Sequence, residues 1–480
     1  MIRGLDTSVK RLRKQVFTEV ARVAWESDNI NEDIEAIPYK ITPGDVPLYR
    51  ESIWRERAIC AERVRLAMGM SLRPEDQPVH VTAGITESNI SEKYYEPPLM
   101  QVIPSACDAC AVKRYKVTDN CRGCVAHPCV EVCPKGAISL QNGRSVIDQD
   151  KCIKCGKCRA ACPYSAIAYE TRPCADACGV NAIESDELGR ARINPDKCVS
   201  CGMCMVNCPF GAIADKSQIF QLIRALKEGG EIIAEIAPAY IGQFGNAGPK
   251  KVKAALMELG FSEVYEVALG ADMGAVTEAH HYVEEVVNGD LPFLLTSCCP
   301  SWSMLAKKYF PTMIDNISQE LTPMVATARS IKQEHPDAKV VFIGPCAAKK
   351  LEASRRSVRS DVDFVITFEE LVGMFDAKGI DMGEKENAHS MHDATAAGRG
   401  YAVAGGVAGA IEECLKAYYP DVTPKIIHAE GLAECKKTLA LAKAGKINGC
   451  LIEGMGCPGG CIAGAGTNLP LNKAAAKVKW

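Results

Sequence analysis

Hydrophobic positions near the start of the chain follow a helical pattern. Val9, Leu12, Val16 and Val20 recur every three or four residues, so they share one face of a helix. We expect this helix to dock on the rest of the protein, because no apolar stretch with a cleavage site follows it to make a targeting segment. Residues 1–100 are predicted to form a helical N-terminal region, whose role the sequence does not reveal.

The pattern changes to alternating apolar runs and helical stretches after residue 216. Short apolar runs at 231–236, 291–295 and 340–343 predict buried strands, whereas 250–259 and 412–418 have helical periodicity. Strands that alternate with helices are typical of an α/β architecture. We therefore expect an α/β domain over residues 216–480 within an α+β multidomain chain.

Between these regions, residues 101–215 hold 16 cysteines and an internal repeat. CIKCGKCRAACPYSAI at 152–167 matches CVSCGMCMVNCPFGAI at 198–213. A Cys-x3-Cys pair precedes each copy at nearly the same offset, Cys129 with Cys133 and Cys174 with Cys178. The repeat predicts two tandem ferredoxin-like modules.

Composition narrows the class of protein. The 480 residues include 25 cysteines in tight groups, and 47% of the residues are hydrophobic. A secreted disulfide scaffold would be shorter, so this pattern indicates a cytoplasmic metal-binding protein. The net charge of −3 predicts no nucleic-acid surface, and the lack of a run of about 18 apolar residues predicts no membrane span.

The short C-x2-C-x2-C loops predict [4Fe–4S] clusters. Each loop binds three irons of one cubane, and a cysteine further along the chain supplies the fourth thiolate to the neighbouring cluster. Zinc sites instead separate their C-x2-C pairs by longer spacers. Three clusters follow from this scheme, held by Cys121, Cys124, Cys129 and Cys162; by Cys152, Cys155, Cys158 and Cys133; and by Cys198, Cys201, Cys204 and Cys178.

Four cysteines of the middle segment are left over. Repeat symmetry assigns Cys174 and Cys208 to one more cluster, but no cysteine occupies the positions where its C-x2-C pair should lie. The unassigned pair nearby is Cys107 and Cys110, and we expect it to fold back and complete a fourth cluster. The alternative is three clusters, with these four cysteines as buried thiols or as a different metal site.

Cysteines also follow three apolar runs of the last domain, in TSCCPSW at 296–302, PCAAKK at 345–350 and EGMGCPGGC at 453–461. Ligands of open α/β folds bind at the carboxyl ends of strands. Cysteines that converge there indicate a buried metal site. The glycines after Met455 indicate that the backbone approaches a bulky group.

These three segments, in this order, resemble the signature motifs of [FeFe]-hydrogenases. The resemblance covers about residues 101–480, and the cysteine-rich layout is more similar to the group B branch than to group A. It implies an H-cluster, which is a [4Fe–4S] cubane joined to a diiron unit with CO, cyanide and azadithiolate ligands. Cys299, Cys346, Cys457 and Cys461 would hold the cubane, and Cys461 would bridge to the diiron unit.

The activity that the resemblance implies is the reversible interconversion of protons, electrons and H2, of the ferredoxin hydrogenase type. Electrons would come from a carrier such as ferredoxin or flavodoxin and would pass through the accessory clusters. Hydrogenase maturation proteins would assemble the diiron unit. No Gly-x-Gly-x-x-Gly segment opens a helix, which argues against a direct reaction with NAD(P)H.

The resemblance also assigns a proton path. Cys298 matches the cysteine that relays protons from the bridging amine, and a thiol suits that role because it both donates and accepts a proton. Glu278 and Ser318 match the carboxylate and the hydroxyl of the onward path. His281 stands where an acidic residue is usual, and Glu285 is a nearby candidate exit group.

Other residues match positions around the diiron unit. Lys349 matches a lysine that binds one cyanide ligand, and Met455 matches a methionine that packs against the irons. Pro238 and Ala239 resemble a segment that packs near the other cyanide. Cys60, Cys414, Cys435 and Cys450 lie outside any motif and are expected to be ordinary core or partly buried thiols.

Three departures from the family pattern fall near the expected cavity. Gly344 stands where methionine is frequent, Met324 where glutamine is frequent, and Gly464-Ala465-Gly466 replaces a glycine triplet. Two other functions stay open, a hydrogen sensor and an iron–sulfur assembly factor of the hydrogenase-like type. The presence of Cys298 argues against the sensor, and the intact 296–302 segment with Lys349 argues against the assembly factor.

Overall fold

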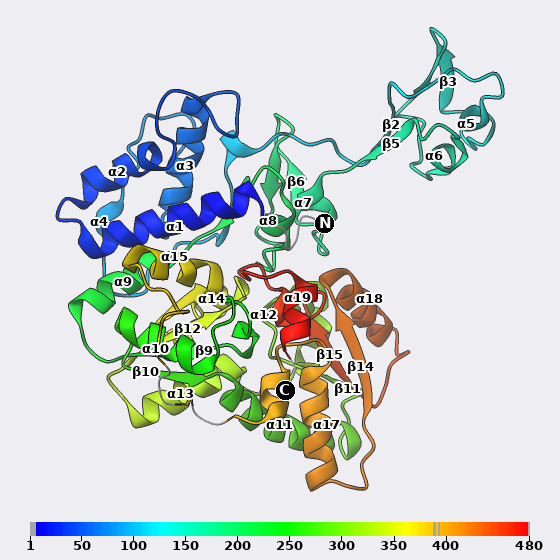
Figure 1. Ribbon diagram of the computed structural model, residues 1–480. Helices are drawn as coiled ribbons and strands as arrows, with labels where there is room; N and C mark the ends of the chain where they lie inside the picture. Colours follow the sequence, from blue (N-terminus) through cyan, green and yellow to red (C-terminus); the bar gives the residue numbers. More distant parts are fainter. Residues whose placement is uncertain (1–5, 387–389, 392–393, 479–480) are drawn as a thin grey trace.

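The computed structural model describes residues 6–386, 390–391 and 394–478. A helical region is followed by two small modules and then by a larger domain of alternating strands and helices (Figure 1). This order confirms the predicted fold class. Each part owes its position to a different kind of contact.

The N-terminal region is helical because its apolar residues recur at helical spacing. Its longest helix, α1, begins after Thr7, whose side chain accepts a hydrogen bond from the Lys10 N–H. Val16 and Val20 are buried, and α1 packs along α15 and α9 of the last domain, so one hydrophobic core joins the two regions. The helices of this region are α1 (Ser8–Glu26), α2 (Ile30–Ile41), α3 (Ile53–Ala67) and α4 (Ile85–Ser88).

The two modules of the middle segment are built from short helices and antiparallel strand pairs. In the first module, β2 pairs with β5 and β3 pairs with β4. Two extended segments connect this module to the rest of the protein, from which it stands apart (Figure 1). Its elements are β2 (Arg114–Val117), α5 (Pro128–Glu131), β3 (Ile138–Gln141), β4 (Arg144–Ile147), α6 (Lys157–Ala161) and β5 (Ile167–Glu170).

The second module lies between the helical region and the last domain (Figure 1). It pairs β6 with β7, and its strand β8 pairs antiparallel with β1, the strand that ends the helical region. The elements are β1 (Met100–Val102), α7 (Pro173–Asp176), β6 (Ile183–Ser185), β7 (Ala191–Ile193), α8 (Met203–Asn207) and β8 (Ile213–Asp215).

The last domain has two wholly parallel sheets, with strand orders β10-β9-β12-β13 and β11-β15-β14. Strands such as β9 and β15 are buried along their whole length, which explains their continuous apolar runs. The strands are β9 (Ile232–Ile236), β10 (Glu263–Glu266), β11 (Phe293–Leu295), β12 (Lys339–Gly344), β13 (Phe364–Thr367), β14 (Lys425–Glu430) and β15 (Cys450–Met455).

Helices cover both sheets. The helix predicted at 250–259 corresponds to α10, and the one predicted at 412–418 is the second half of α17, which begins earlier, at Gly406. The helices are α9 (Ile219–Glu228), α10 (Pro249–Leu259), α11 (Ala268–Tyr282), α12 (Pro300–Tyr309), α13 (Pro323–Glu334), α14 (Ala348–Glu352), α15 (Phe368–Lys378), α16 (Ala396–Gly400), α17 (Gly406–Tyr418), α18 (Leu432–Lys443) and α19 (Leu471–Lys477).

Two further properties concern the helices and the cysteines of the protein. None of the helices in the described part of the chain combines the length and the apolar character needed to cross a membrane. All 25 cysteines lie in the described ranges, and every one of them is a free thiol.

Candidate active site

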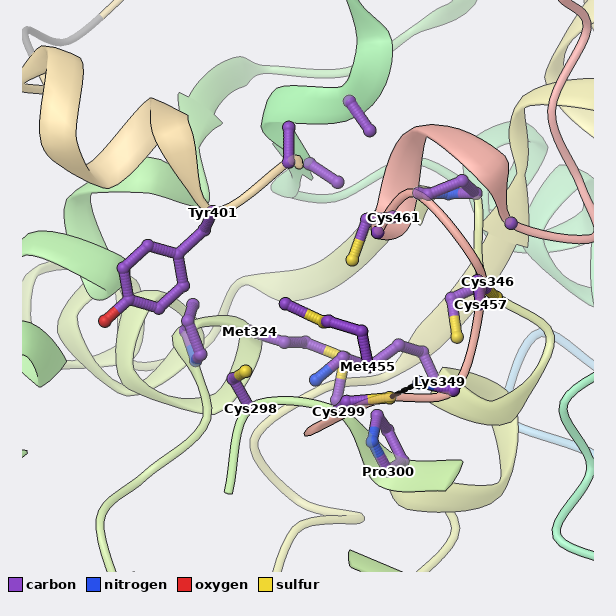
Figure 2. A pocket seen from close by; sticks show the side chains of 18 of the residues that line it. Cys298, Cys299, Pro300, Met324, Cys346, Lys349, Tyr401, Met455, Cys457 and Cys461 are labelled. Atoms are coloured by element: carbon purple, nitrogen blue, oxygen red, sulfur yellow. Dashed lines mark hydrogen bonds between the residues drawn. The ribbon is translucent and has the colours of Figure 1, made fainter. Parts of the chain in front are cut away.

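A cavity of roughly 830 Å³, its open mouth included, lies where strands of both sheets end. The loops after β9 and β12 line it from one sheet, and the loops after β11 and β15 line it from the other. The cavity therefore occupies the position where open α/β folds bind their ligands. Figure 2 shows the side chains that surround it.

Four cysteines from three separate segments face this cavity. Cys299 follows β11, Cys346 follows β12, and Cys457 and Cys461 follow β15 (Figure 2). Burial raises the pKa of Cys346 to about 11 and that of Cys461 to about 12, so these thiols resist ionisation in the protein alone. The Gly456 N–H lies 3.4 Å from Cys299 Sγ and donates to it.

This donor set fits an iron–sulfur cubane. No three Cys, His, Asp or Glu side chains of the described residues converge closely enough for one shared metal ion. A cubane binds each thiolate through a different iron, which needs separated sulfurs around a hollow. Apolar side chains and a single cation, Lys349, complete the lining.

Lys349 presents a buried ammonium to the cavity. Its Nζ lies 2.7 Å from Glu352 Oε2 in a buried ion pair, and this single carboxylate oxygen does not use all three donors of the ammonium. Burial opposes the charge, yet the Glu352 carboxylate and the neighbouring cysteines raise the pKa of Lys349. The Thr322 hydroxyl donates to Glu352 Oε1 at 2.7 Å and so holds the Glu352 carboxylate in place beside Lys349. A charged donor is thus available to an anionic ligand.

The predicted proton-path residues lie near one another beside the cavity. Cys298 lines the cavity. Burial raises the pKa of its thiol, and the negative charge of Glu278 raises it further. Glu278 is buried on α11, and Ser318 and the backbone of Ser297 lie close enough to its carboxyl group to oppose the rise of its pKa. Burial raises the pKa of Glu278 to about 8, so the carboxyl carries a proton at neutral pH.

The outer part of the predicted path is less connected. Nδ1 of His281 is buried and has no hydrogen-bond partner among the described residues. Glu285, in the irregular turn that ends α11, is exposed. No hydrogen bond between described residues joins His281 or Glu285 to Glu278, so this part of the path stays a prediction.

The residues that depart from the family pattern have definite places. Met324 is fully buried and lines the cavity beside Met455, Pro238 and Ala239. Gly344 lies against Phe342, because a Cβ at this glycine would come within 2.5 Å of the Phe342 ring. Phe342 lines the cavity and fills the space next to Gly344.

The cysteines of the first module gather in its small core. Cys129, Cys133, Cys152, Cys158 and Cys162 pack around Ile138, Ile147 and Ile167. Cys121 and Cys124 are half-buried, and Cys155 is exposed. The fold thus brings the two predicted ligand sets into one compact unit.

One backbone contact recurs at four cysteines of the two modules. The amide four residues further on donates to the sulfur at 3.2–3.4 Å in each case. The cysteines are Cys133, Cys162, Cys178 and Cys208. Cys133, Cys162 and Cys178 are each predicted to supply the fourth thiolate of a cluster. The same geometry at Cys208 supports the same role for that cysteine.

Cys201 lines the main cavity as well as belonging to the second module. The Ser301 hydroxyl, directly after Cys299 and Pro300, donates to the Val199 carbonyl at 3.2 Å. The predicted ligand set of Cys198, Cys201, Cys204 and Cys178 therefore adjoins the candidate active site.

A second, smaller cavity of about 310 Å³ collects the four cysteines left over in the sequence. Cys107, Cys110, Cys174 and Cys208 line it together. The Ala191 N–H donates to Cys107 Sγ at 3.3 Å. The donor set fits a cubane on the same grounds as the main site.

Sequence reasoning missed Tyr401 and Glu352. Tyr401 is buried and lines the main cavity, its hydroxyl has no hydrogen-bond partner among the described residues, and the charges of Glu278 and Cys298 act on it (Figure 2). It precedes α17 in a segment without cysteines, so no sequence signal could have placed it there. Glu352 follows Lys349 by one helical turn, and that spacing was an available signal.

Comparisons with known proteins agree with this geometry. The family model "Iron only hydrogenase large subunit, C-terminal domain" matches residues 230–465, and the "4Fe-4S binding domain" matches 145–168 and 191–214. Iron hydrogenase 1 of Clostridium pasteurianum is 30% identical over 387 residues, which cover 69% of this chain and 67% of the relative.

The chain belongs to the iron-only hydrogenase family. The large subunit of a periplasmic [Fe] hydrogenase from Nitratidesulfovibrio vulgaris is 30% identical over 377 residues, covering 67% of this chain and 85% of that protein. A solved [FeFe]-hydrogenase HydA1 from Chlamydomonas reinhardtii has a TM-score of 0.44 and 22% identity, covering 52% of this chain and 84% of that one. As a member of this family, the protein is an iron–sulfur hydrogenase with an electron-relay segment.

A weaker similarity links the chain to an assembly factor. The cytosolic Fe-S cluster assembly factor NAR1 of Meyerozyma guilliermondii is 28% identical over 181 residues, which cover 32% of this chain and 34% of that protein. The hydrogenase relatives match more than twice as many residues of the chain at slightly higher identity.

Proposed function

We propose that this iron-only hydrogenase catalyses the reversible reaction of two protons and two electrons to H2 and takes its electrons from a ferredoxin or flavodoxin. The observation that carries the proposal is the convergence of Cys298, Cys299, Cys346, Cys457 and Cys461 with Lys349 on one cavity. The group B assignment is part of this proposal and rests on the sequence layout alone.

Within that cavity, Cys299, Cys346, Cys457 and Cys461 would hold the cubane of an H-cluster, with Cys461 shared with the diiron unit. When bound, the H-cluster supplies an iron pair at which H2 is split and a cubane that conducts the electrons. Lys349 would be able to donate to a cyanide ligand, because its ion pair with Glu352 does not use all three donors of the ammonium. Met455, Pro238 and Ala239 exclude water from the diiron position.

Proton transfer in this proposal uses two side chains in sequence, Cys298 and Glu278, with Ser318 beside the second. Once Glu278 has released its proton outward, the Cys298 thiol would donate its own proton to the Glu278 carboxylate, and the resulting thiolate could then take up a proton from the side of the cavity. Ser318 lies beside the Glu278 carboxyl group and would orient it. A carboxyl with a pKa near 8 suits this role, because it exchanges protons close to neutral pH.

Electrons would pass through four accessory [4Fe–4S] clusters. The first module holds two of them, and the cavity of Cys107, Cys110, Cys174 and Cys208 would hold the third along the path. The cluster of Cys198, Cys201, Cys204 and Cys178 comes last, because Cys201 lines the active-site cavity. The domain boundaries at about 100 and 215 belong to this proposal.

We further propose that hydrogenase maturation proteins insert the diiron unit and that the enzyme works in the cytoplasm. The cytoplasmic location rests on the cysteine pattern, since tight groups of cysteines in a long chain are typical of cytoplasmic metal-binding proteins. An iron–sulfur assembly factor is the rival function. It is disfavoured because Lys349 and the 296–302 segment retain the features that bind a diiron unit.

One pair of measurements tests the proposal. The full chain is produced together with hydrogenase maturation proteins, and its infrared spectrum and its viologen-coupled H2 turnover are recorded. We expect CO and cyanide bands together with turnover. Bands without turnover would favour a hydrogen sensor, and the absence of bands would favour an assembly factor.

A further inference from the structure

Two arginines beside the smaller cavity are buried without a carboxylate partner. Arg63, on α3, is 7% exposed, and Arg172, just before α7, is 5% exposed. Within the described ranges neither forms an ion pair. Arg63 donates to the Gly211 carbonyl, and Arg172 donates to the carbonyls of Cys110, Glu184 and Gly189 and to the Ser185 hydroxyl.

Both guanidinium groups contact backbone next to the cavity's cysteines. Gly211 follows Cys208 by three residues, and Cys208 packs against Ile59 and Leu66 of α3. Arg172 lines the cavity itself, with Nε and Nη2 at 3.2 and 3.1 Å from the Cys110 carbonyl oxygen. The electrostatic fields of Arg63 and Arg172 act on Cys208 and Cys174 respectively.

Burying a charge without an opposite charge is costly, and neither guanidinium has an anionic partner in the described ranges, so an anion in the adjacent cavity would stabilise both. Burial lowers the pKa of Arg63 only to about 10, and the group stays protonated at neutral pH. Its Nε and Nη1 have no hydrogen-bond partner in the described part of the chain. A cubane with four thiolate ligands carries net negative charge, and the cavity of Cys107, Cys110, Cys174 and Cys208 is the place for it.

We propose that Arg63 and Arg172 are the counter-charges of an iron–sulfur cluster held by these four cysteines, and that they raise its reduction potential. This inference rests on the proposed fourth accessory cluster. Reduction adds one electron to the cluster, and nearby positive charge favours the more negative state. The N-terminal helical region thereby acquires a role, because α3 supplies a charge that tunes the electron path where the two modules meet.

The same helix offers a matched control. Arg55 donates through Nε to the Ser105 carbonyl at 2.9 Å, two residues before Cys107, and so resembles Arg63 in its backbone contact. Unlike Arg63, it forms an ion pair with Glu51. Its charge is therefore already compensated, and its removal is expected to leave the cluster potential near the wild-type value.

The test is a redox titration of the full chain, loaded with iron and sulfide and followed by electron paramagnetic resonance. The signal of the cluster is identified first, as the one lost in a Cys107→Ser/Cys110→Ser variant. At the potential where this cluster is half reduced in wild type, we expect Arg63→Met and Arg172→Met each to lower the ratio of reduced to oxidised cluster roughly tenfold. Arg63→Lys and Arg55→Met should stay close to wild type.

The outcomes separate the inference from the function on which it rests. If the Cys107→Ser/Cys110→Ser variant loses no iron and no signal, the fourth cluster itself is refuted. If that cluster exists but its potential is unchanged in Arg63→Met and in Arg172→Met, the counter-charge role is overturned. Loss of the cluster in Arg63→Met with retention in Arg63→Lys supports a need for charge, whereas loss in both variants would show that shape, not charge, matters.

Discussion

At the scale of single residues, burial controls the protonation of the groups beside the main cavity. Glu278 is a carboxyl that keeps its proton at neutral pH, and Lys349 is an ammonium that keeps its charge. Cys298 is a thiol whose pKa burial raises well above its usual value, so it does not ionise unaided. These states suit a path that moves protons between neutral groups.

The relay role of Cys298 is tested by Cys298→Ala. We expect H2 turnover to fall by about two orders of magnitude or more, because a positioned acid–base group contributes at least that much. The infrared bands of CO and cyanide should persist, since Cys298 is not a proposed ligand. Cys414→Ala, which removes a half-buried thiol outside the cavity, is the control. Near-normal turnover in Cys298→Ala would refute the relay assignment.

The protonation of Glu278 is tested by pH. Its pKa is raised by burial to about 8, so the carboxyl is neutral below that pH and anionic above it. The infrared difference spectrum between wild type and Glu278→Gln should contain a protonated-carboxyl band at pH 7 that disappears above about pH 8. A carboxylate band at pH 7 in that difference spectrum would contradict the assignment.

The residues of the site were predictable where a short motif carries them. The cysteines and Lys349 lie in compact segments directly after strands, so their sequence neighbours reveal them. Tyr401 lines the main cavity, and Arg63 approaches Cys208 through its contact with the Gly211 carbonyl, in both cases only through tertiary packing. The local sequence cannot predict such residues, because their partners lie on elements that are distant in the chain.

At the scale of elements, buried ions fasten α1 to the last domain. Arg13 lies 2.9 Å from Glu369 and 3.6 Å from Asp215, and Lys350 lies 2.7 Å from both Asp215 and Glu370. All five side chains are buried. Helical periodicity predicted the docked apolar face of α1, but it could not predict a buried Arg13, whose partners come from β8 and α15.

Removing one charged side chain from this ion cluster should destabilise the folded protein. We expect Arg13→Met to lower the free energy of unfolding by about 3–5 kcal/mol, because it leaves buried carboxylates without their counter-charge. Lys14→Met is the matched control. Lys14 pairs with Asp376 at 2.8 Å on the surface, and its removal should cost less than about 1 kcal/mol. Equal effects of the two changes in urea unfolding would refute this account of how α1 is anchored.

The packing of β15 depends on a glycine. A Cβ at Gly454 would overlap the ring of Trp302, which is fully buried on α12. We expect Gly454→Ala to destabilise the protein by about 1–3 kcal/mol through overpacking. In contrast, Gly409→Ala in α17 meets no atom within 4 Å and should be neutral or slightly stabilising in thermal unfolding. If Gly454→Ala left the stability of the protein unchanged, Trp302 would have to be able to move aside.

At the scale of the whole molecule, the cysteines gather in the core of the first module, at the smaller cavity and at the main cavity. The smaller cavity lies at the junction of the modules, and Cys201 reaches the main cavity. The repeat in the sequence predicted the modules. It could not fix the fourth site, because Cys107 and Cys110 reach it only when the chain folds back.

Iron content tests this arrangement. Chain produced without the maturation proteins should bind about 20 irons, four for each of four accessory cubanes and for the cubane of the main site. Cys107→Ser/Cys110→Ser should bind about four fewer. Iron and sulfide analysis of matched preparations measures both values. About 16 irons in the wild-type chain, unchanged in the variant, would leave only three accessory clusters.

The most direct test of the central claim is a crystal structure of the mature protein with the anomalous signal of iron. The account predicts a cubane bound by Cys299, Cys346, Cys457 and Cys461, with two further irons beside Cys298, linked to the cubane through the sulfur of Cys461. A main cavity without iron, or one filled by a different prosthetic group, would contradict it.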